Sequence, residues 1–224
     1  MAMNIASLVV GILGLAATVG LYIWPKRKEK KRNIKLFIKD FNNIVERVNV
    51  MLTLGAYLQS LERAIYKNQS QLDSHAVSDA ILNVVYTLKT INPWVTVSSL
   101  SRCTSYIKQY KSVKINDKAI NVENLTDLIE KLCTQADVVN NEIKKIQRII
   151  SSDNSQKTKI KKMISGDISK HHKPVLPTLS CQELEKAYEE MFEALNATLK
   201  QMKTTVDKFP AIFQNDFFNN KGGE

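Results

Sequence analysis

Apolar residues recur at helical spacing over most of the chain. In residues 33–68, 123–150 and 180–209 they return every three, four or seven positions, and a shorter stretch at 73–92 does the same. This period predicts amphipathic helices. The helices predict an all-α fold, an antiparallel bundle of four columns whose long members resemble coiled coils. The heptads also permit an oligomeric coiled coil, and we favour an intramolecular core.

The segment between these stretches has two interpretations. The pattern of residues 94–112 predicts a third helix, less strongly than the patterns above predict theirs. Residues 113–122, VKINDKAINV, alternate apolar and polar side chains about Asn116 and Asp117, a pattern typical of a short β-hairpin. We favour a helix followed by a loop over the hairpin.

The sequence also predicts where helices begin and end. Ser180 and Glu183 have the spacing of a capping box, which predicts the start of the last long helix. That helix is expected to end before Pro210, because proline cannot continue the helical hydrogen bonds. For the same reason Pro25 is expected to end the first helix of the chain.

That first helix is apolar on all sides. From Ile5 to Trp24 there are 20 residues without a charge, about the length that spans a bilayer. Tyr22 and Trp24 stand where interfacial aromatic side chains lie. Because no basic residue precedes the segment and no small-residue cleavage site follows it, the sequence favours a retained transmembrane helix over a signal peptide.

The positive charge of the chain is concentrated in two places. The chain holds 32 Lys and Arg against 22 Asp and Glu, a net charge of +10. Residues 26–32 and 157–173 contribute +5 each, so the remainder is neutral. Since basic residues follow the apolar segment and none precedes it, the positive-inside rule places residues 26–224 in the cytoplasm and the N-terminus outside. Residues 26–32, the basic collar, are expected to bind anionic lipid headgroups. The basic residues of the collar are Lys26, Arg27, Lys28, Lys30, Lys31 and Arg32.

The second basic patch falls in a predicted loop, residues 151–179. This loop is expected either to be solvated or to contact lipid phosphate, nucleic acid or an acidic partner. Because no aromatic side chains are interleaved with the lysines, the pattern disfavours nucleic acid. The candidate contact residues are Lys157, Lys159, Lys161, Lys162, Lys170 and Lys173.

Two further features bear on association. Small residues four, three and four positions apart form a small-residue stripe along the apolar segment, on which a second membrane helix can approach closely. The members of this stripe are Ser7, Gly11, Gly14 and Thr18. The tail after Pro210 is aromatic, and is expected either to fold back onto the bundle or to dock in the groove of a partner. Its candidate docking residues are Phe213, Phe217 and Phe218.

The sequence contains no motif for catalysis. It has no phosphate-binding glycine loop, Cys-x-x-Cys pair, His-Glu-x-x-His helix or nucleophile elbow. His75 is expected at a helix start, and His171 and His172 in a solvated loop, rather than in a metal site. The cysteines are odd in number and widely spaced along the chain, which favours reduced thiols over disulfides. The cysteines are Cys103, Cys133 and Cys181. We therefore expect no enzymatic activity, cofactor, metal or small-molecule substrate.

These features divide the chain into six segments with distinct expected roles. They are a transmembrane anchor (1–25), the collar (26–32), the bundle (33–150), the basic loop (151–179), the final helix (180–209) and the aromatic tail (210–224). The organisation predicts a non-catalytic, single-pass membrane-tethered protein whose cytosolic bundle binds a protein partner or a second copy. The alternative is a membrane-active effector of the toxin or defence type, whose spans oligomerise and permeabilise the membrane when the bundle is triggered.

Overall fold

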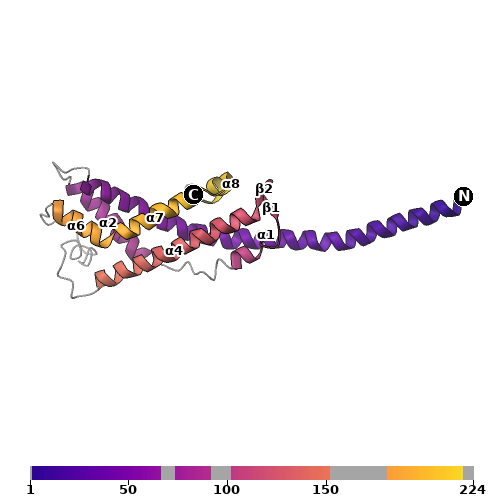
Figure 1. Ribbon diagram of the computed structural model, residues 1–224, viewed down its shortest axis with the longest axis horizontal. Coiled ribbons are helices and arrows are strands. Elements are labelled where there is room, and N and C mark those ends of the chain that lie inside the picture. Colours follow the sequence, from indigo (N-terminus) through magenta and orange to yellow (C-terminus); the bar gives the residue numbers. More distant parts are fainter. Residues whose placement is uncertain (1, 67–73, 92–101, 152–180, 219–224) are drawn as a thin grey trace.

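The structure is a computed structural model that describes residues 2–66, 74–91, 102–151 and 181–218 (Figure 1). Within these ranges it describes the backbone alone at residues 2–17, 19, 20, 22, 74, 75, 78, 151 and 181. Most of the described residues are helical, so the predicted all-α fold class is confirmed.

Helix α1 (Ala2–Tyr66) is 65 residues long and continuous. At about 1.5 Å per residue it extends for about 100 Å, and its N-terminal part projects from the other helices as a single rod (Figure 1). The prediction that Pro25 ends a helix is wrong, because α1 passes through it. Proline removes one backbone hydrogen bond. The Lys, Arg and Glu residues that follow Pro25 favour the helical state and continue α1 into the bundle.

Four helical columns form the bundle. Helix α1 packs against α2 (Ser74–Thr90) and against the column of α6 (Cys181–Met191) and α7 (Glu193–Val206). Helix α4 (Val122–Ser151) packs against α7 and α2 and so closes the ring. Successive columns run in opposite directions (Figure 1). The predicted antiparallel bundle is therefore confirmed.

The core consists of the apolar stripes that the sequence predicts. In α4 the heptad positions Leu125, Leu132, Val139 and Ile146 are each at most 2% exposed. Burying a side chain of this size contributes roughly 1.5–3 kcal/mol. Because these positions face the other columns of the same chain, the heptads form an intramolecular core. The buried apolar residues of α1 are Phe37, Phe41, Ile44, Val45, Val48, Met51, Leu54, Leu58, Leu61 and Ile65.

The last column differs in detail from the predicted single helix over 180–209. It is divided at Phe192, whose ring is buried and lies 6.1 Å from that of Tyr188. The helical hydrogen bonds continue on both sides of the division, from Phe192 N to Tyr188 O and from Asn196 N to Phe192 O. Helix α7 ends at Val206, before Pro210 as predicted. The predicted capping residue Ser180 lies outside the described residues.

A β-hairpin occupies the segment that had two interpretations. Strands β1 (Ser112–Ile115) and β2 (Lys118–Asn121) pair antiparallel, with Ser112 opposite Asn121. Asn116 and Asp117 have φ values of 46° and 62°, as a two-residue hairpin turn requires. The favoured helix over 94–112 is wrong in its described part, where only residues 102–105 are helical.

The aromatic tail folds back onto the bundle. Helix α8 (Ala211–Phe213) and the π-helical turn η1 (Gln214–Phe218) place three phenylalanine rings around Phe41. Phe213 and Phe218 are buried. Asp216 Oδ2 accepts a hydrogen bond of 2.6 Å from Asn116 Nδ2, which ties the tail to the hairpin. The expected folding back is therefore confirmed, since Phe213 and Phe218 belong to the core and Phe217 packs against it. Docking of these residues in the groove of a partner stays a prediction.

Gly55 lies where α1 packs tightly against α7. A Cβ atom placed on Gly55 would lie 3.2 Å from Leu199 Cβ. We expect Gly55→Leu to lower the free energy of unfolding by about 1–3 kcal/mol, because the added side chain forces the two helices apart. Urea titration of the full chain in mild detergent, followed by circular dichroism, measures this change.

The neighbouring position supplies the control for this substitution. Ala56 is exposed on the same turn of α1, so Ala56→Leu is expected to change the free energy of unfolding by less than about 0.5 kcal/mol. Equal losses at Gly55 and Ala56 would show that helix packing at Gly55 does not limit side-chain size.

Candidate functional site at the neck of the bundle

The basic collar lies where α1 enters the bundle. We call this region, residues 24–40 of α1 with the hairpin β1–β2 beside it, the neck (Figure 1). The collar side chains are exposed except for Lys30, which is half-buried. Lys30 Nζ donates a hydrogen bond of 3.0 Å to Ser112 O and lies 5.0 Å from the centre of the Tyr110 ring. The collar is thus attached to the first strand of the hairpin.

The chain that leads into the hairpin is held along α1. Asn33 Nδ2 donates to the Tyr110 hydroxyl at 3.2 Å. Arg102 Nε lies 3.0 Å from Asp40 Oδ2 in an ion pair. Because the Asp40 side chain is only 14% exposed, this pair is less screened than the other, more exposed pairs of the bundle. These contacts fix the position of the hairpin relative to the collar.

The hairpin adds positive charge to the neck. Residues 108–118 contain four lysines and one aspartate, a net charge of +3 (4 − 1), and each of these side chains is exposed. Sequence reasoning missed this cluster because the segment was interpreted as a helix and a loop. The signal that could have found it is the alternation of Val113 and Ile115 with Lys114, which turns the lysine away from the core.

An exposed aromatic residue lies two residues before the collar. The Trp24 side chain is 69% exposed, and Lys28 Nζ lies 5.5 Å from the centre of its ring. Trp24 and Lys30 are six residues apart, or about 9 Å along the helix. The hairpin therefore contacts α1 about 9 Å along the helix axis from Trp24.

The structure describes the side chain of only one of the four residues of the small-residue stripe. Thr18 is described and exposed, whereas Ser7, Gly11 and Gly14 are placed by their backbone alone. For most residues of the segment Ile5–Trp24 the structure likewise describes the backbone alone. Among the side chains that the structure does describe, no helix combines the length and the apolar character needed to cross a membrane.

Other predicted site residues also lie outside the description. Residues 152–180 are not described, so neither the lysines of the basic loop nor His171 and His172 can be related to the neck. For His75 the backbone alone is described. No group of three or more metal-ligating side chains gathers within the described ranges.

The two described thiols belong to the core. Cys103 and Cys133 are free and buried, and Cys103 Sγ donates a weak hydrogen bond to Phe37 O at 3.8 Å. Burial, with a smaller contribution from Asp40, raises the pKa of Cys103 to about 12. Burial also raises the pKa of Cys133, with the nearby Cys103 acting in the same direction. Neither thiol is a nucleophile at neutral pH, because each stays protonated.

The neck thus combines an exposed tryptophan and the collar on α1 with the lysines of the hairpin beside it, an arrangement suited to an anionic surface. No protein family model matches the chain, and comparison with curated proteins and with solved structures gives no significant match.

Proposed function

We propose that the protein is a non-catalytic, membrane-tethered interaction protein. In this proposal the segment Ile5–Trp24 spans the membrane, the collar lies at the headgroups, and the bundle binds a protein partner or a second copy in the cytoplasm. The observation that supports it best is the continuity of α1 from the apolar segment through the collar into the core. A helix of this kind joins a membrane anchor to a folded domain without a flexible linker.

The charges of the neck support the same orientation. A basic residue near an anionic leaflet contributes about 1 kcal/mol of attraction. The collar supplies six such residues, and Lys111, Lys114 and Lys118 are exposed at the same end of the bundle. Trp24 then stands at the level of an interfacial aromatic side chain. The opposite end of the bundle, where α1 reaches Tyr66, faces away from the membrane in this arrangement.

The small-residue stripe is the proposed contact between copies. Its spacing of four, three and four residues keeps one side of the helix free of bulky side chains. In a bilayer, close packing at such a side is a main source of helix association. The proposal therefore assigns folding to the bundle core and assembly to the stripe.

Membrane insertion is tested with the full chain in vesicles that contain phosphatidylserine. We expect the chain to float with the vesicles and to resist extraction by alkaline carbonate. Val10→Lys with Leu13→Lys should release it, because each lysine at mid-membrane opposes insertion by about 2.5–3.5 kcal/mol. The matched control places two lysines on the exposed bundle surface, Ala56→Lys with Thr134→Lys. Extraction of the unaltered chain by carbonate would contradict the proposal.

The same vesicles distinguish the alternative function, a membrane-active effector. Its support is that α1 joins the apolar segment rigidly to the bundle, so that an event at the bundle reaches the membrane. Release of a trapped dye on insertion, abolished by Gly11→Leu with Gly14→Leu, would favour the effector. Retention of the dye with an intact stripe favours the tethered interaction protein.

A further inference from the structure

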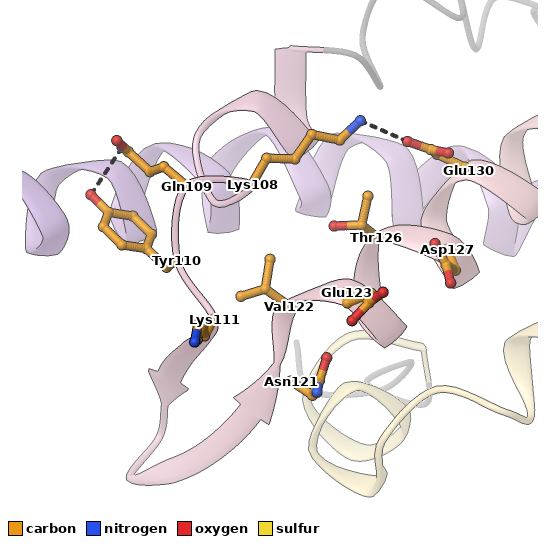
Figure 2. A pocket seen from close by; sticks show the side chains of 10 residues that line it. All are labelled: Lys108, Gln109, Tyr110, Lys111, Asn121, Val122, Glu123, Thr126, Asp127 and Glu130. Atoms are coloured by element: carbon orange, nitrogen blue, oxygen red, sulfur yellow. Dashed lines mark hydrogen bonds and ion pairs between the residues drawn. The ribbon is translucent and has the colours of Figure 1, made fainter.

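A polar pocket lies between the base of the hairpin and the start of α4. Its volume is about 690 Å³, within the range of small-molecule sites. Figure 2 shows residues 108–111 along one side of it and the first turns of α4 along the other. The lining residues are Lys108, Gln109, Tyr110, Lys111, Asn121, Val122, Glu123, Thr126, Asp127 and Glu130.

One hydroxyl in this pocket has no partner. Thr126 is only 7% exposed, and its Oγ1 makes no hydrogen bond. In Figure 2 this oxygen points into the space between α4 and residues 108–111. A buried polar atom in a native protein normally finds a partner, so an orphan that faces a pocket indicates a ligand.

Other threonines of the helices show that this geometry is exceptional. Thr53, Thr87, Thr90, Thr134, Thr198, Thr204 and Thr205 each donate to the carbonyl four residues earlier. This back-bonding is the usual solution for a helical threonine. Thr126 has the same option within α4 and does not use it, which leaves its hydroxyl without a partner at the wall of the pocket.

Negative and positive side chains lie on opposite sides of the pocket. Glu123 and Asp127 stand four residues apart on α4, so that two like charges share one face. Lys111 lies across the pocket from them in Figure 2. Lys108 and Glu130 close the rim with an ion pair of 2.9 Å. A ligand that enters thus meets a carboxylate pair on one side and an ammonium on the other.

Tyr110 lies next to Lys111, and its ring points away from the pocket so that its hydroxyl lies beside Gln109 (Figure 2). Its hydroxyl oxygen accepts hydrogen bonds from Asn33 Nδ2 at 3.2 Å and from Gln109 Nε2 at 3.1 Å. Lys111 is therefore the group that suits an oxyanion on this side of the pocket.

We infer that this pocket binds a small zwitterion that carries an ammonium and an oxyanion. The ammonium is held by Glu123 and Asp127, the oxyanion by Lys111, and Thr126 Oγ1 bonds the ligand between them. A lone anion would face the carboxylates and a lone cation would face Lys111, so neither satisfies both sides. This inference goes beyond the proposed function and does not depend on membrane attachment.

Phosphoethanolamine is the probe for the test, with inorganic phosphate and ethanolamine as its separate halves. Isothermal titration of the full chain in mild detergent is expected to show saturable one-to-one binding of phosphoethanolamine. Each half alone should bind at least tenfold more weakly. No binding of phosphoethanolamine at millimolar concentration, or equal binding of phosphate alone, would overturn the inference.

Substitutions locate the binding. Lys111→Met, and Glu123→Gln with Asp127→Asn, are each expected to weaken phosphoethanolamine binding at least tenfold. Thr126→Val removes one hydrogen bond and should weaken it about fivefold to tenfold. Thr134→Val, on an exposed turn of the same helix, and Lys131→Met, outside the pocket, are the matched controls and should leave affinity unchanged.

The stability of the Thr126→Val variant separates a ligand contact from a structural role. Since the hydroxyl has no partner, valine should keep or raise the midpoint of urea unfolding while it lowers affinity. A lowered midpoint with unchanged affinity would overturn the assignment of Thr126.

The source of the zwitterion is a separate question with its own measurement. Vesicles that contain phosphatidylethanolamine present the same chemistry as a lipid headgroup. If Thr126→Val weakens attachment to these vesicles and not to phosphatidylserine vesicles, the ligand is a headgroup. If it weakens only the binding of free phosphoethanolamine, the ligand is a soluble zwitterion. Either result supports the site.

Discussion

Replacing Phe41 with alanine is expected to lower the free energy of unfolding by about 3–5 kcal/mol. Phe41 is fully buried in α1, and five other phenylalanine rings lie 5.2–6.3 Å from its own. These rings are Phe37, Phe209, Phe213, Phe217 and Phe218. The loss combines the unfilled volume with edge-to-face contacts worth about 0.5–1.5 kcal/mol each.

Proteolysis can show which part of the protein the Phe41→Ala substitution destabilises. Because Phe41 holds α8 and η1 to the bundle, Phe41→Ala should also make residues 211–218 sensitive to protease under conditions in which the rest stays folded. Tyr86 on α2 is 72% exposed, so Tyr86→Ala serves as the control and should change stability by less than about 0.5 kcal/mol. A Phe41→Ala variant as stable as this control would refute the central role of the aromatic cluster.

The second large effect is a loss of stability in alkaline solution. Cys103 and Cys133 have pKa values raised from 9.0 by burial. Unfolding exposes both thiols, which then ionise near pH 9. The folded state binds more protons above that pH, so stability is fully present below pH 9 and falls as the pH rises through the folded pKa, about 12 for Cys103. Between pH 8 and pH 10 we expect the two thiols to lower the free energy of unfolding by about 3 kcal/mol.

Urea titrations at several pH values measure this slope. Cys103→Ala with Cys133→Ala should be less stable at pH 7 and should show a smaller decrease toward pH 10. The difference between the two slopes isolates the thiols from the lysines and tyrosines that titrate in the same range. In a Cys181→Ser background, the native chain at pH 8 should react with Ellman's reagent only after urea is added. Rapid reaction without urea would contradict the burial of both thiols.

The long columns were predictable because each has one requirement, an apolar face at helical spacing. Leu125, Leu132 and Val139 satisfy it in α4, and Phe37 and Phe41 in α1. The course of α1 through Pro25 was not predictable from that residue alone, because the cost of one missing hydrogen bond is set against the helical preference of residues on both sides. The packing of the aromatic tail likewise depends on rings contributed by α1, which are distant in the sequence.

The hairpin and the pocket were harder to predict from the sequence than the long helices. Four-residue strands carry too little periodicity to outweigh a helical interpretation, although Asn116 and Asp117 gave the turn signal. The pocket brings Lys111 together with Thr126 and Asp127, and none of these stands in a motif. Its decisive feature is a hydroxyl that lacks a partner, which is a property of three-dimensional placement and leaves no trace in the sequence.

The continuity of α1 has a mechanical consequence. In an α-helix each residue advances by about 1.5 Å and turns by about 100°, so the azimuth of the small-residue stripe is set relative to the hairpin. One residue inserted next to Trp24 would rotate the apolar segment by about a quarter turn while barely lengthening the rod. Two copies joined at their stripes would hold their bundles at a defined angle. Torsion, as well as displacement, can therefore pass along α1 between its two ends.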